Sequence, residues 1–516
     1  MALPHSAPTF QPIQTWPSRD LLATVDRLRI ETNGRLNPKH RSEFGQFMTP
    51  APVAALMVSM IGNQTDDVKL LDAGAGVGSL TAAAVAELLS RPFKPRSIHV
   101  TALEIDPTMV KSLHQTLALC AAECGTAGVS FASEVLQEDF LDRASSWLSP
   151  SLFADAAHPR FNLAIQNPPY KKMHSASGAR SFARAIGIET SNLYTAFLAA
   201  TLQLLEHGGQ LVAICPRSFC NGPYFLPFRQ LFLEQMSLRR IHVFQSRQEA
   251  FKDDEVLQET VIVSAHRDKR NGAVQISSSK DAVSPVSSRI APFSEVVSPD
   301  DRQRFIHIRS DDEAQDVAAE MAALPCTLVD LGIKVSTGRV VDFRAKEHLR
   351  AYPDNETIPL IYPTNMIDGV VVWPRETRKP QALHVNVNTA DLMVPSGPYV
   401  LTKRFSSKEE RRRVVAAVVD PAEVPGQAIG FENHLNYYHR AGVPLDMEFA
   451  RGLALYLNTT LVDEYFRQFN GHTQVNATDL RALRYPSAQA LRTIGAQGKC
   501  TSDQAEVDAI VEGVIS

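Results

Sequence analysis

Short apolar runs alternate with amphipathic segments between residues 44 and 263. The apolar runs have the length of buried strands, and the segments between them carry apolar residues at helical spacing. This alternation predicts an α/β fold with a mostly parallel, doubly wound sheet, whose last strand pair can be antiparallel. The expected strands are residues 68–72, 98–103, 161–165, 210–215, 240–244 and 260–264, and the expected helices are residues 80–89, 108–123, 193–205 and 227–235.

The pattern changes after residue 266. The next polar stretch, residues 268–299, is rich in Ser, Asp and Lys and is typical of a hairpin or a linker, and a helix is expected at residues 312–324. Shorter strands, turns and aromatic-rich segments then indicate a second domain of different architecture. The expected organisation is a lead-in at 1–40, an α/β domain at 41–266, a connecting segment at 267–327, a second domain at 328–490 and a tail at 491–516.

Composition narrows the class of protein. With 516 residues, 44% of them hydrophobic and 21% charged, the chain has the profile of a soluble globular protein of two or three domains. We expect no membrane span, because no apolar run reaches about 18 residues. The N-terminus lacks the basic stretch and apolar core of a secretion signal. Six cysteines without CxxC spacing favour a reducing, cytoplasmic compartment and no metal site.

The net charge of −4 does not by itself indicate a nucleic-acid partner. Binding to phosphates depends on a local basic surface rather than on the net charge of the whole chain. Residues 401–414 carry six Lys or Arg side chains and two Glu side chains, and six minus two gives a local charge of +4. This run is either a phosphate-facing surface or a solvated helix face.

A glycine-rich loop follows the first expected strand, in the order Asp72-Ala-Gly74-Ala-Gly76-Val-Gly78. Glycines allow a tight turn and close approach to a ligand, and the following helix N-terminus supplies backbone donors. Such loops also serve NAD and FAD, but Ser79 stands where the dinucleotide spacing requires glycine. The loop alone is therefore weak support for any one cofactor.

Two acidic residues at the ends of later elements strengthen the cofactor hypothesis. Glu104, 26 residues after Gly78, suits an acceptor for ribose hydroxyls. Asp139 can accept from an adenine amine while Phe140 packs against the ring. Either acid alone is as well explained by a helix N-cap or a loop charge. In this order, at strand ends, they predict a nucleoside cofactor.

The fourth expected strand leads into Asn167-Pro168-Pro169-Tyr170. A polar Asn before two prolines places a side-chain carbonyl and a backbone carbonyl on a rigid turn, and both are acceptors. Two acceptors that bind both hydrogens of one amine draw its lone pair out of conjugation and direct it at an electrophilic methyl group. Tyr170 supplies a flat surface for a planar substrate. Without the cofactor series, a simple strand-ending turn would be the better interpretation.

The order of these motifs resembles the gamma group of DNA adenine-N6 methyltransferases from type II restriction–modification systems, over roughly residues 41–490. The resemblance implies a Rossmann-like sheet that binds S-adenosyl-L-methionine (SAM), followed by a C-terminal mixed α+β target-recognition domain. It implies methyl transfer to N6 of a flipped-out adenine in double-stranded DNA. It also implies a bacterial or archaeal cytoplasmic enzyme whose cognate restriction endonuclease is a separate chain.

The resemblance also assigns residues to the cofactor and to catalysis. Asn167, Pro168 and Tyr170 match the catalytic motif, and Tyr170 together with Phe251 would stack on the flipped base. Phe244 competes with Phe251 for that role, and a core aromatic is the alternative for either. The cofactor-binding matches are Phe47, Thr49, Pro50, Asp72, Gly74, Gly76, Glu104, Ile105, Asp139 and Phe140.

The DNA contacts are implied less specifically. Lys171 and Lys172 follow the catalytic motif and either meet phosphates or remain solvated loop charges. In the second domain, polar loop residues could reach base edges while basic residues hold the backbone, or they could bond to their own loops. The second-domain residues are Lys403, Arg404, His472, Gln474 and Asn476.

Several other functions share parts of this pattern. A protein glutamine-N5 methyltransferase uses the same Asn-Pro-Pro-Tyr logic, but the large C-terminal domain and the Phe-containing motif at Phe44–Phe47 argue against it. Cytosine-N4 methyltransferases usually carry Ser or Asp where Asn167 stands. RNA adenine remains open as a substrate. The intact Asp72, Glu104 and Asn167 argue against a catalytically inactive specificity module, and no nuclease pattern indicates a fused endonuclease.

Overall fold

The computed structural model describes most of the chain in two compact units, residues 1–311 and 312–516, which are treated separately. Within the described residues, no helix is long and apolar enough to cross a membrane. The described residues are 19–36, 48–62, 65–149, 159–174, 177–244, 259–268, 270, 272–309, 312–406, 410–470, 473–497, 501 and 503–515.

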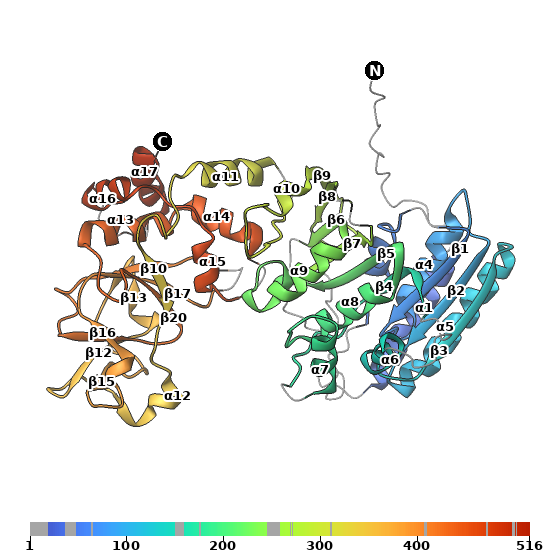
Figure 1. Cartoon of the computed structure of the whole chain (residues 1–516), viewed down its shortest axis with the longest axis horizontal. Coiled ribbons are helices and arrows are strands. Elements are labelled where there is room, and N and C mark those ends of the chain that lie inside the picture. The colour runs from blue at the N-terminus through green and yellow to red at the C-terminus, as the bar shows by residue number, and fades with distance from the viewer. Residues whose placement is uncertain are drawn as a thin grey trace, which may run out of the picture. The chain divides into compact units, whose positions relative to one another are not determined.

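The first unit is built on a sheet of nine described strands in the order β3-β2-β1-β4-β5-β7-β6-β8-β9 (Figure 1). The first five strands in this order are parallel, and β7 is antiparallel to both β5 and β6. The predicted doubly wound sheet with an antiparallel final pair is thus confirmed. The strands are β1 (Asp67–Ala73), β2 (Ser97–Leu103), β3 (Ser130–Leu136), β4 (Phe161–Gln166), β5 (Leu205–Pro216), β6 (Ser237–Phe244), β7 (Thr260–His266), β8 (Ala273–Ser279) and β9 (Ser287–Pro292).

Helices pack against the sheet in two separate apolar cores. One core combines the sheet with α1 (Arg19–Arg35), α3 (Ala51–Val58), α4 (Ser79–Ser90) and α5 (Pro107–Thr126). The other core combines it with α6 (Phe140–Leu148), α7 (Gly178–Ala185), α8 (Leu193–Leu204) and α9 (Leu226–Gln235). Because both faces are covered, the central strands are buried on both sides, which explains their nearly continuous apolar sequences.

Two regions add to the expected organisation. The connecting segment 267–327 contains β8 and β9, which form the hairpin that was one of the two expectations and which belong to the sheet, followed by α10 (Phe293–Val296). The lead-in contains α1, whose Leu21 and Val25 are buried in the core. The strand β3 was not expected, because its side chains are mostly exposed and it lacks the apolar run of the central strands.

The second unit is mixed α+β, as predicted. Its described strands form a six-stranded sheet, β10-β20-β17-β18-β14-β13, and a five-stranded sheet, β11-β15-β12-β19-β16. The strands are β10 (Lys334–Thr337), β11 (Leu349–Arg350), β12 (Thr357–Ile361), β13 (Met366–Ile367), β14 (Val370–Val371), β15 (Ala382–His384), β16 (Met393–Pro395), β17 (Tyr399–Lys403), β18 (Ala416–Val419), β19 (Ala428–Phe431) and β20 (Leu435–His439).

Helices of the second unit extend into the segment expected to be a tail. The α13 and α16 backbones touch, since a Cβ on Gly452 would lie 1.8 Å from the Leu491 carbonyl oxygen. The helices are α11 (Asp312–Ala323), α12 (Asp342–Ala345), α13 (Met447–Leu457), α14 (Thr460–Phe469), α15 (Ala477–Arg481), α16 (Ala488–Gln497) and α17 (Gln504–Ile515).

Candidate active site

A pocket in the first unit opens where β1, β2 and β4 end. The carboxyl ends of parallel strands meet at one edge of a doubly wound sheet, and ligands bind there. The lining brings together residues from the segment before α3, the glycine loop, the two acidic motifs and the Asn-Pro-Pro-Tyr motif. It consists of Met48, Thr49, Gly74, Ala75, Gly76, Val77, Ser79, Leu80, Leu103, Glu104, Ile105, Met109, Glu138, Asp139, Phe140, Asn167, Pro169, Leu193 and Phe197.

The glycine loop forms the floor of this pocket. The N–H groups of Gly74 and Ala75 both donate to the Leu103 carbonyl, at 3.0 and 2.9 Å, which ties the loop to the end of β2. Gly78 precedes α4 with φ +85°, and a Cβ there would lie 2.8 Å from Leu113 Cδ1. Glycine is therefore required at position 78 by both the backbone conformation and the close packing of α5.

Glu104 lies between the glycine loop and the pocket. Its Oε2 accepts from the Gly76 N–H at 2.8 Å, and its Oε1 accepts from the Asp106 N–H at 2.9 Å. Burial raises the pKa of the Glu104 carboxyl, although backbone hydrogen bonds from Asp106, Gly76 and Ile105 favour its ionised form. A carboxylate has about four acceptor positions, so it retains capacity to accept from a hydroxyl group of a ligand in the pocket.

Asp72 has a different place from the one expected of a cofactor contact. It is fully buried and does not line the pocket; its Oδ2 accepts from the Thr81 hydroxyl at 2.6 Å. Burial raises the pKa of Asp72 to about 7, and the nearby Glu104 adds to the shift. Asp72 thus supports the loop and α4 from beneath, and its part in cofactor binding stays a prediction. Pro50, the N-cap of α3, is also outside the lining.

The far wall of the pocket combines an acid with apolar side chains. Asp139 is the N-cap of α6, and its Oδ1 accepts from the Leu141 and Asp142 N–H groups at 2.7 and 3.2 Å. Both capping bonds use Oδ1, so the cap leaves Oδ2 for a ligand. Phe140 packs on Phe197 with ring centroids 5.0 Å apart, and Ile105 exposes 43% of its surface at the rim. This wall suits a flat ring with an exocyclic amine.

The Asn-Pro-Pro-Tyr motif directly follows β4. The Asn167 amide nitrogen donates to the Thr49 hydroxyl oxygen at 3.1 Å, so two segments 118 residues apart meet at the pocket. The Pro169 carbonyl accepts from the Lys171 N–H at 3.2 Å. Among the described residues, no donor reaches the carbonyl of Pro168. The turn thus presents acceptor groups beside the cofactor pocket.

Tyr170 packs at the base of this turn. Its ring meets Tyr194 edge-on with centroids 6.4 Å apart, and its hydroxyl donates to the Ile214 carbonyl at 3.4 Å. Burial raises the pKa of the Tyr170 phenol well above its ordinary value. Phe244 is buried in the core at the end of β6. Phe251 and Phe47 lie outside the described residues.

Several pocket residues were not expected from the sequence. Met48, Met109, Leu193 and Phe197 line the cavity, and they come from a loop and from two helices. Phe197 occurs in the middle of the uniformly apolar α8, so its sequence context is that of a core residue. Leu193 and Met109 each lie in the first turn of a helix near the carboxyl edge of the sheet. This position in the sequence is the signal that could have predicted them as pocket residues.

Comparisons with known proteins agree with this geometry. Residues 101–251 match the family model described as Eco57I restriction-modification methylase. The type II methyltransferase M.PstI of Providencia stuartii is 43% identical over 94% of this chain and 96% of its own length. M.BsuBI of Bacillus subtilis is 44% identical over 92% of this chain and 93% of its own length. The chain belongs to the type II methyltransferases.

The fold of this type II methyltransferase also has a counterpart among solved structures. The type IIL restriction-modification enzyme MmeI, solved in complex with DNA, aligns with 96% of this chain and 75% of its own, at a TM-score of 0.51 and 11% identity. The methyltransferase uses SAM as its cofactor. The pocket fits this group, because it offers a glycine cradle, a buried acid, a second acid and an apolar wall.

Residues expected to contact DNA from the second unit of the methyltransferase fall into two groups. Lys403 and Arg404 are partly exposed, and Arg404 Nη1 donates to the Asn433 carbonyl at 3.0 Å. The backbone N–H of Asn476 donates to Asp479 Oδ2 at 3.0 Å and its amide nitrogen to the same oxygen at 3.3 Å, so Asn476 caps α15, and its contact with DNA stays a prediction. Gln474 is partly exposed, and His472 lies outside the described residues.

The basic run at residues 401–414 does not form a helix in its described part. Arg413 is fully buried and donates from Nη2 to Asn470 Oδ1 at 2.7 Å and from Nε to Ser406 Oγ at 3.2 Å. Arg412 is partly buried and donates to the Asn458 carbonyl at 2.6 Å. The run was interpreted as either a phosphate-facing surface or a solvated helix face. Neither interpretation applies to these two arginines, because both donate hydrogen bonds to other segments of the second unit.

Proposed function

We propose that this methyltransferase transfers the methyl group of SAM to N6 of an adenine in double-stranded DNA. We further propose that the modification protects the site from a separate restriction endonuclease. The observation that carries the proposal is the position of Asn167 and Pro168, which follow β4 directly beside the cofactor pocket. In the same place, Thr49, Glu104 and Asp139 line the cavity.

The two acceptors account for the choice of an exocyclic amine. Asn167 Oδ1 and the Pro168 carbonyl oxygen each accept one hydrogen of the amine, so its nitrogen becomes more tetrahedral and its lone pair leaves conjugation with the ring. When bound, SAM would supply an electrophilic methyl carbon, and its sulfonium sulfur would leave as that carbon bonds to the nitrogen. The methylated nitrogen then loses one proton to solvent. No nucleophilic side chain is required.

The remaining roles follow from this reaction. An adenine amine inside a stacked duplex is inaccessible, so the target base is flipped into the site at a cost of a few kcal/mol. We assign stacking on that base to Tyr170 and Phe251. Phe47, Thr49, Gly74, Gly76, Glu104, Ile105, Asp139 and Phe140 are proposed to hold SAM.

The DNA assignment rests on two supports. The second unit gives the chain a large domain beyond catalysis, and MmeI, which shares the fold, was solved with DNA bound. Lys171 and Lys172 are exposed immediately after the motif, where a nearby phosphate backbone would meet them. We propose contacts to DNA from these two lysines and, in the second unit, from Lys403, Arg404, His472 and Gln474.

The experiment that tests the proposal identifies the methylated atom. The protein is incubated with tritiated SAM and duplex DNA, RNA or a protein extract, and the labelled DNA is digested to nucleosides. We expect the label in N6-methyldeoxyadenosine. Label in N4-methyldeoxycytidine, in RNA alone or in protein glutamine would overturn the assignment.

Replacement of Asn167 by Ala tests the catalytic role separately. Loss of one acceptor at the reacting nitrogen should lower kcat by about a hundredfold or more. Binding of SAM, measured by calorimetry, should stay close to wild type because the glycine loop and Glu104 are intact. An Asn167→Ala variant with wild-type kcat would contradict the role.

A further inference from the structure

The contact between Thr49 and Asn167 joins two motifs that the proposed function treats separately. Thr49 is 4% exposed, and its hydroxyl oxygen accepts from the Asn167 amide nitrogen at 3.1 Å. Thr49 also stands immediately before Pro50, the N-cap of α3. The position of this short helix therefore sets the position of the hydroxyl.

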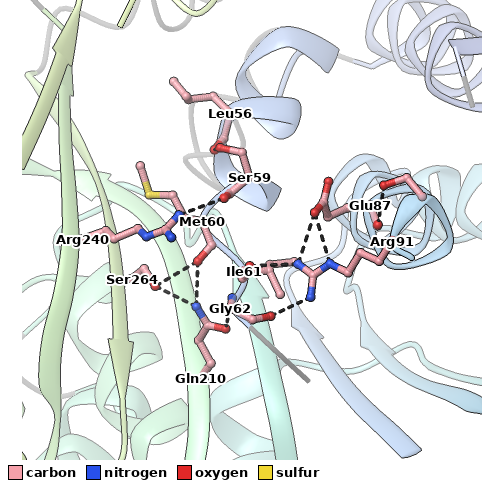
Figure 2. A network of polar contacts seen from close by, with 11 residues as sticks. Leu56, Ser59, Met60, Ile61, Gly62, Glu87, Arg91, Gln210, Arg240 and Ser264 are labelled. Carbon is pink, nitrogen blue, oxygen red and sulfur yellow. Dashed lines mark hydrogen bonds and ion pairs between the residues drawn. The ribbon is translucent and has the colours of Figure 1, made fainter. Parts of the chain in front are cut away.

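The opposite end of α3 is held by side chains from the sheet (Figure 2). Gln210 of β5 donates from Nε2 to the Met60 carbonyl at 2.8 Å and accepts from the Gly62 N–H at 2.9 Å. Ser264 of β7 donates to the same Met60 carbonyl at 3.3 Å. Gln210 and Ser264 are each 1% exposed, so these bonds form in a buried environment where lost partners are costly.

Two arginines hold the neighbouring carbonyls of this segment. Arg240 of β6 donates from Nη1 to the Ser59 carbonyl at 3.0 Å. Arg91, beyond α4, donates to the carbonyls of Ile61 and Gly62 at 2.8 and 2.6 Å. Four successive carbonyls after α3 thus receive side-chain donors, as Figure 2 shows. Backbone carbonyls in a packed segment outside regular structure need such partners, and here the partners come from three strands and from the residue that follows α4.

These contacts fix α3 against the sheet whose strand β4 leads directly into Asn167. The helix also buries Val53, Ala54, Leu56, Met57 and Val58 in the core. Thr49 and Asn167 therefore belong to one rigid framework although they are distant in sequence. Catalytic groups need such support, because a misplacement of about 1 Å can cost a hundredfold in rate.

We propose that Thr49 is a positioning residue that sets the orientation of the Asn167 amide, an inference that rests on the proposed function. An amide can present either its oxygen or its NH2 group to the substrate after a half turn of its terminal bond. An NH2 group facing the adenine amine could not form a hydrogen bond with it in this role, because both groups would be donors. By accepting from the amide nitrogen, the Thr49 hydroxyl directs the Asn167 oxygen to the amine.

The test compares Thr49→Val with Thr49→Ser. Valine keeps the shape of threonine but removes the acceptor, whereas serine retains it. We expect Thr49→Val to lower kcat, measured at saturating SAM, by about tenfold or more, with the KM for DNA close to wild type. Thr49→Ser should restore most of the activity. If valine lowers the melting temperature too far for assay, Thr49→Ala makes the same comparison.

A matched control separates orientation from loss of rigidity. Thr201 is also buried, and its hydroxyl donates to the amide oxygen of Gln166, the neighbour of Asn167, at 3.3 Å. Thr201→Val should cost stability without lowering kcat. An equal loss of kcat in Thr201→Val, an unchanged kcat in Thr49→Val, or a loss confined to SAM affinity would each overturn the inference.

The wild-type assay distinguishes this inference from the proposed function. If the wild-type protein does not label N6-methyldeoxyadenosine, the proposed function fails. If it does, the ratio of kcat between Thr49→Val and wild type tests Thr49 alone.

Discussion

The two units use their polar side chains differently. In the first unit, Glu104, Asp139 and Asn167 come from separate strand ends and all line one pocket. In the second unit, Arg413 and Asn470, which lie in loops, and Asp479 of α15 form a buried chain of hydrogen bonds, near the segments where base-reading residues were expected. Polar residues at parallel strand ends face a ligand site. Polar residues in a loop-rich domain can instead form hydrogen bonds within the domain, which stabilise its loops.

The difference has a topological cause. Parallel strands of a doubly wound sheet place their carboxyl ends along one edge, so order in the sequence predicts proximity in space. Short strands joined by long loops give no such guarantee, and buried backbone groups in loops need side-chain partners. Asn470 illustrates this need, because its amide nitrogen donates to the Gln474 carbonyl at 3.0 Å and to Asp479 Oδ2 at 3.2 Å.

The largest effect should come from breaking the buried cluster of the second unit. Arg413→Ala leaves the buried acceptors of Asn470 and Ser406 without their charged donor, and we expect a loss of about 3 kcal/mol or more in the free energy of unfolding. Arg411→Ala, at an exposed neighbouring position, should change it by about 0.5 kcal/mol or less. Urea unfolding followed by circular dichroism measures both. Equal losses of unfolding free energy in the two variants would contradict the special role of Arg413 in the buried cluster.

Each unit contains a buried aspartate whose pKa is raised to about 7, which makes the pH dependence of the two units comparable. Burial raises the pKa of Asp72 and of Asp479 from 3.8 to about 7. Each acid therefore binds its proton more tightly in the folded protein. The resulting stability is fully present below pH 3.8 and is lost as the pH rises through about 7.

Each acid should contribute roughly 1.4 kcal/mol for each unit by which its pKa is raised. Asp72→Asn and Asp479→Asn should each flatten the decline of unfolding free energy between about pH 4 and pH 7. The exposed Asp391→Asn serves as the control. A wild-type protein whose stability rises with pH over this range would contradict both assignments.

A comparison of two glycines with the same backbone conformation tests why the cofactor loop needs glycine at position 78. Gly78 and Gly208 have φ +85° and +82°, but only a Cβ at Gly78 would meet another atom within 4 Å. Gly78→Ala should therefore cost about 1–3 kcal/mol more than Gly208→Ala, because overpacking adds to the shared backbone strain. It should also weaken SAM binding, measured by calorimetry. Equal costs in the two variants would show that the contact with Leu113 relaxes freely.

The smallest effect concerns the exposed lysines after the catalytic motif. Replacement of Lys171 and Lys172 by Ala should weaken DNA binding modestly and reduce the slope of log K against log salt by about 0.9 per phosphate contact. Lys94 is exposed ahead of β2, at the amino edge of the sheet, so Lys94→Ala should leave the slope unchanged. Binding is measured at several salt concentrations. An unchanged slope in the double variant would mark both lysines as solvated charges.

The sequence predicted the first unit well for physical reasons that can be named. Central strands such as β1 and β4 are buried on both faces, so their apolar runs stand out, and the motifs lie where those runs end. The pocket wall at Phe197 was missed because an apolar residue inside α8 has the same pattern whether it faces the core or a ligand. In the second unit, Arg413 could not be assigned, since its partners Ser406 and Asn470 are brought to it only by the fold. Asn476 caps α15 together with Asp479, three residues later, a local pattern that was not noticed in the sequence.

The unexpected strand β3 has a consequence for solubility. It forms an outer edge of the large sheet, where unpaired N–H and C=O groups offer a template to another chain. Its sequence, Ser-Phe-Ala-Ser-Glu-Val-Leu, exposes small and charged side chains at Ser130, Ser133 and Glu134. The same polar residues that weakened the strand pattern in the sequence therefore disfavour aggregation, because a polar edge discourages pairing with a strand of another chain.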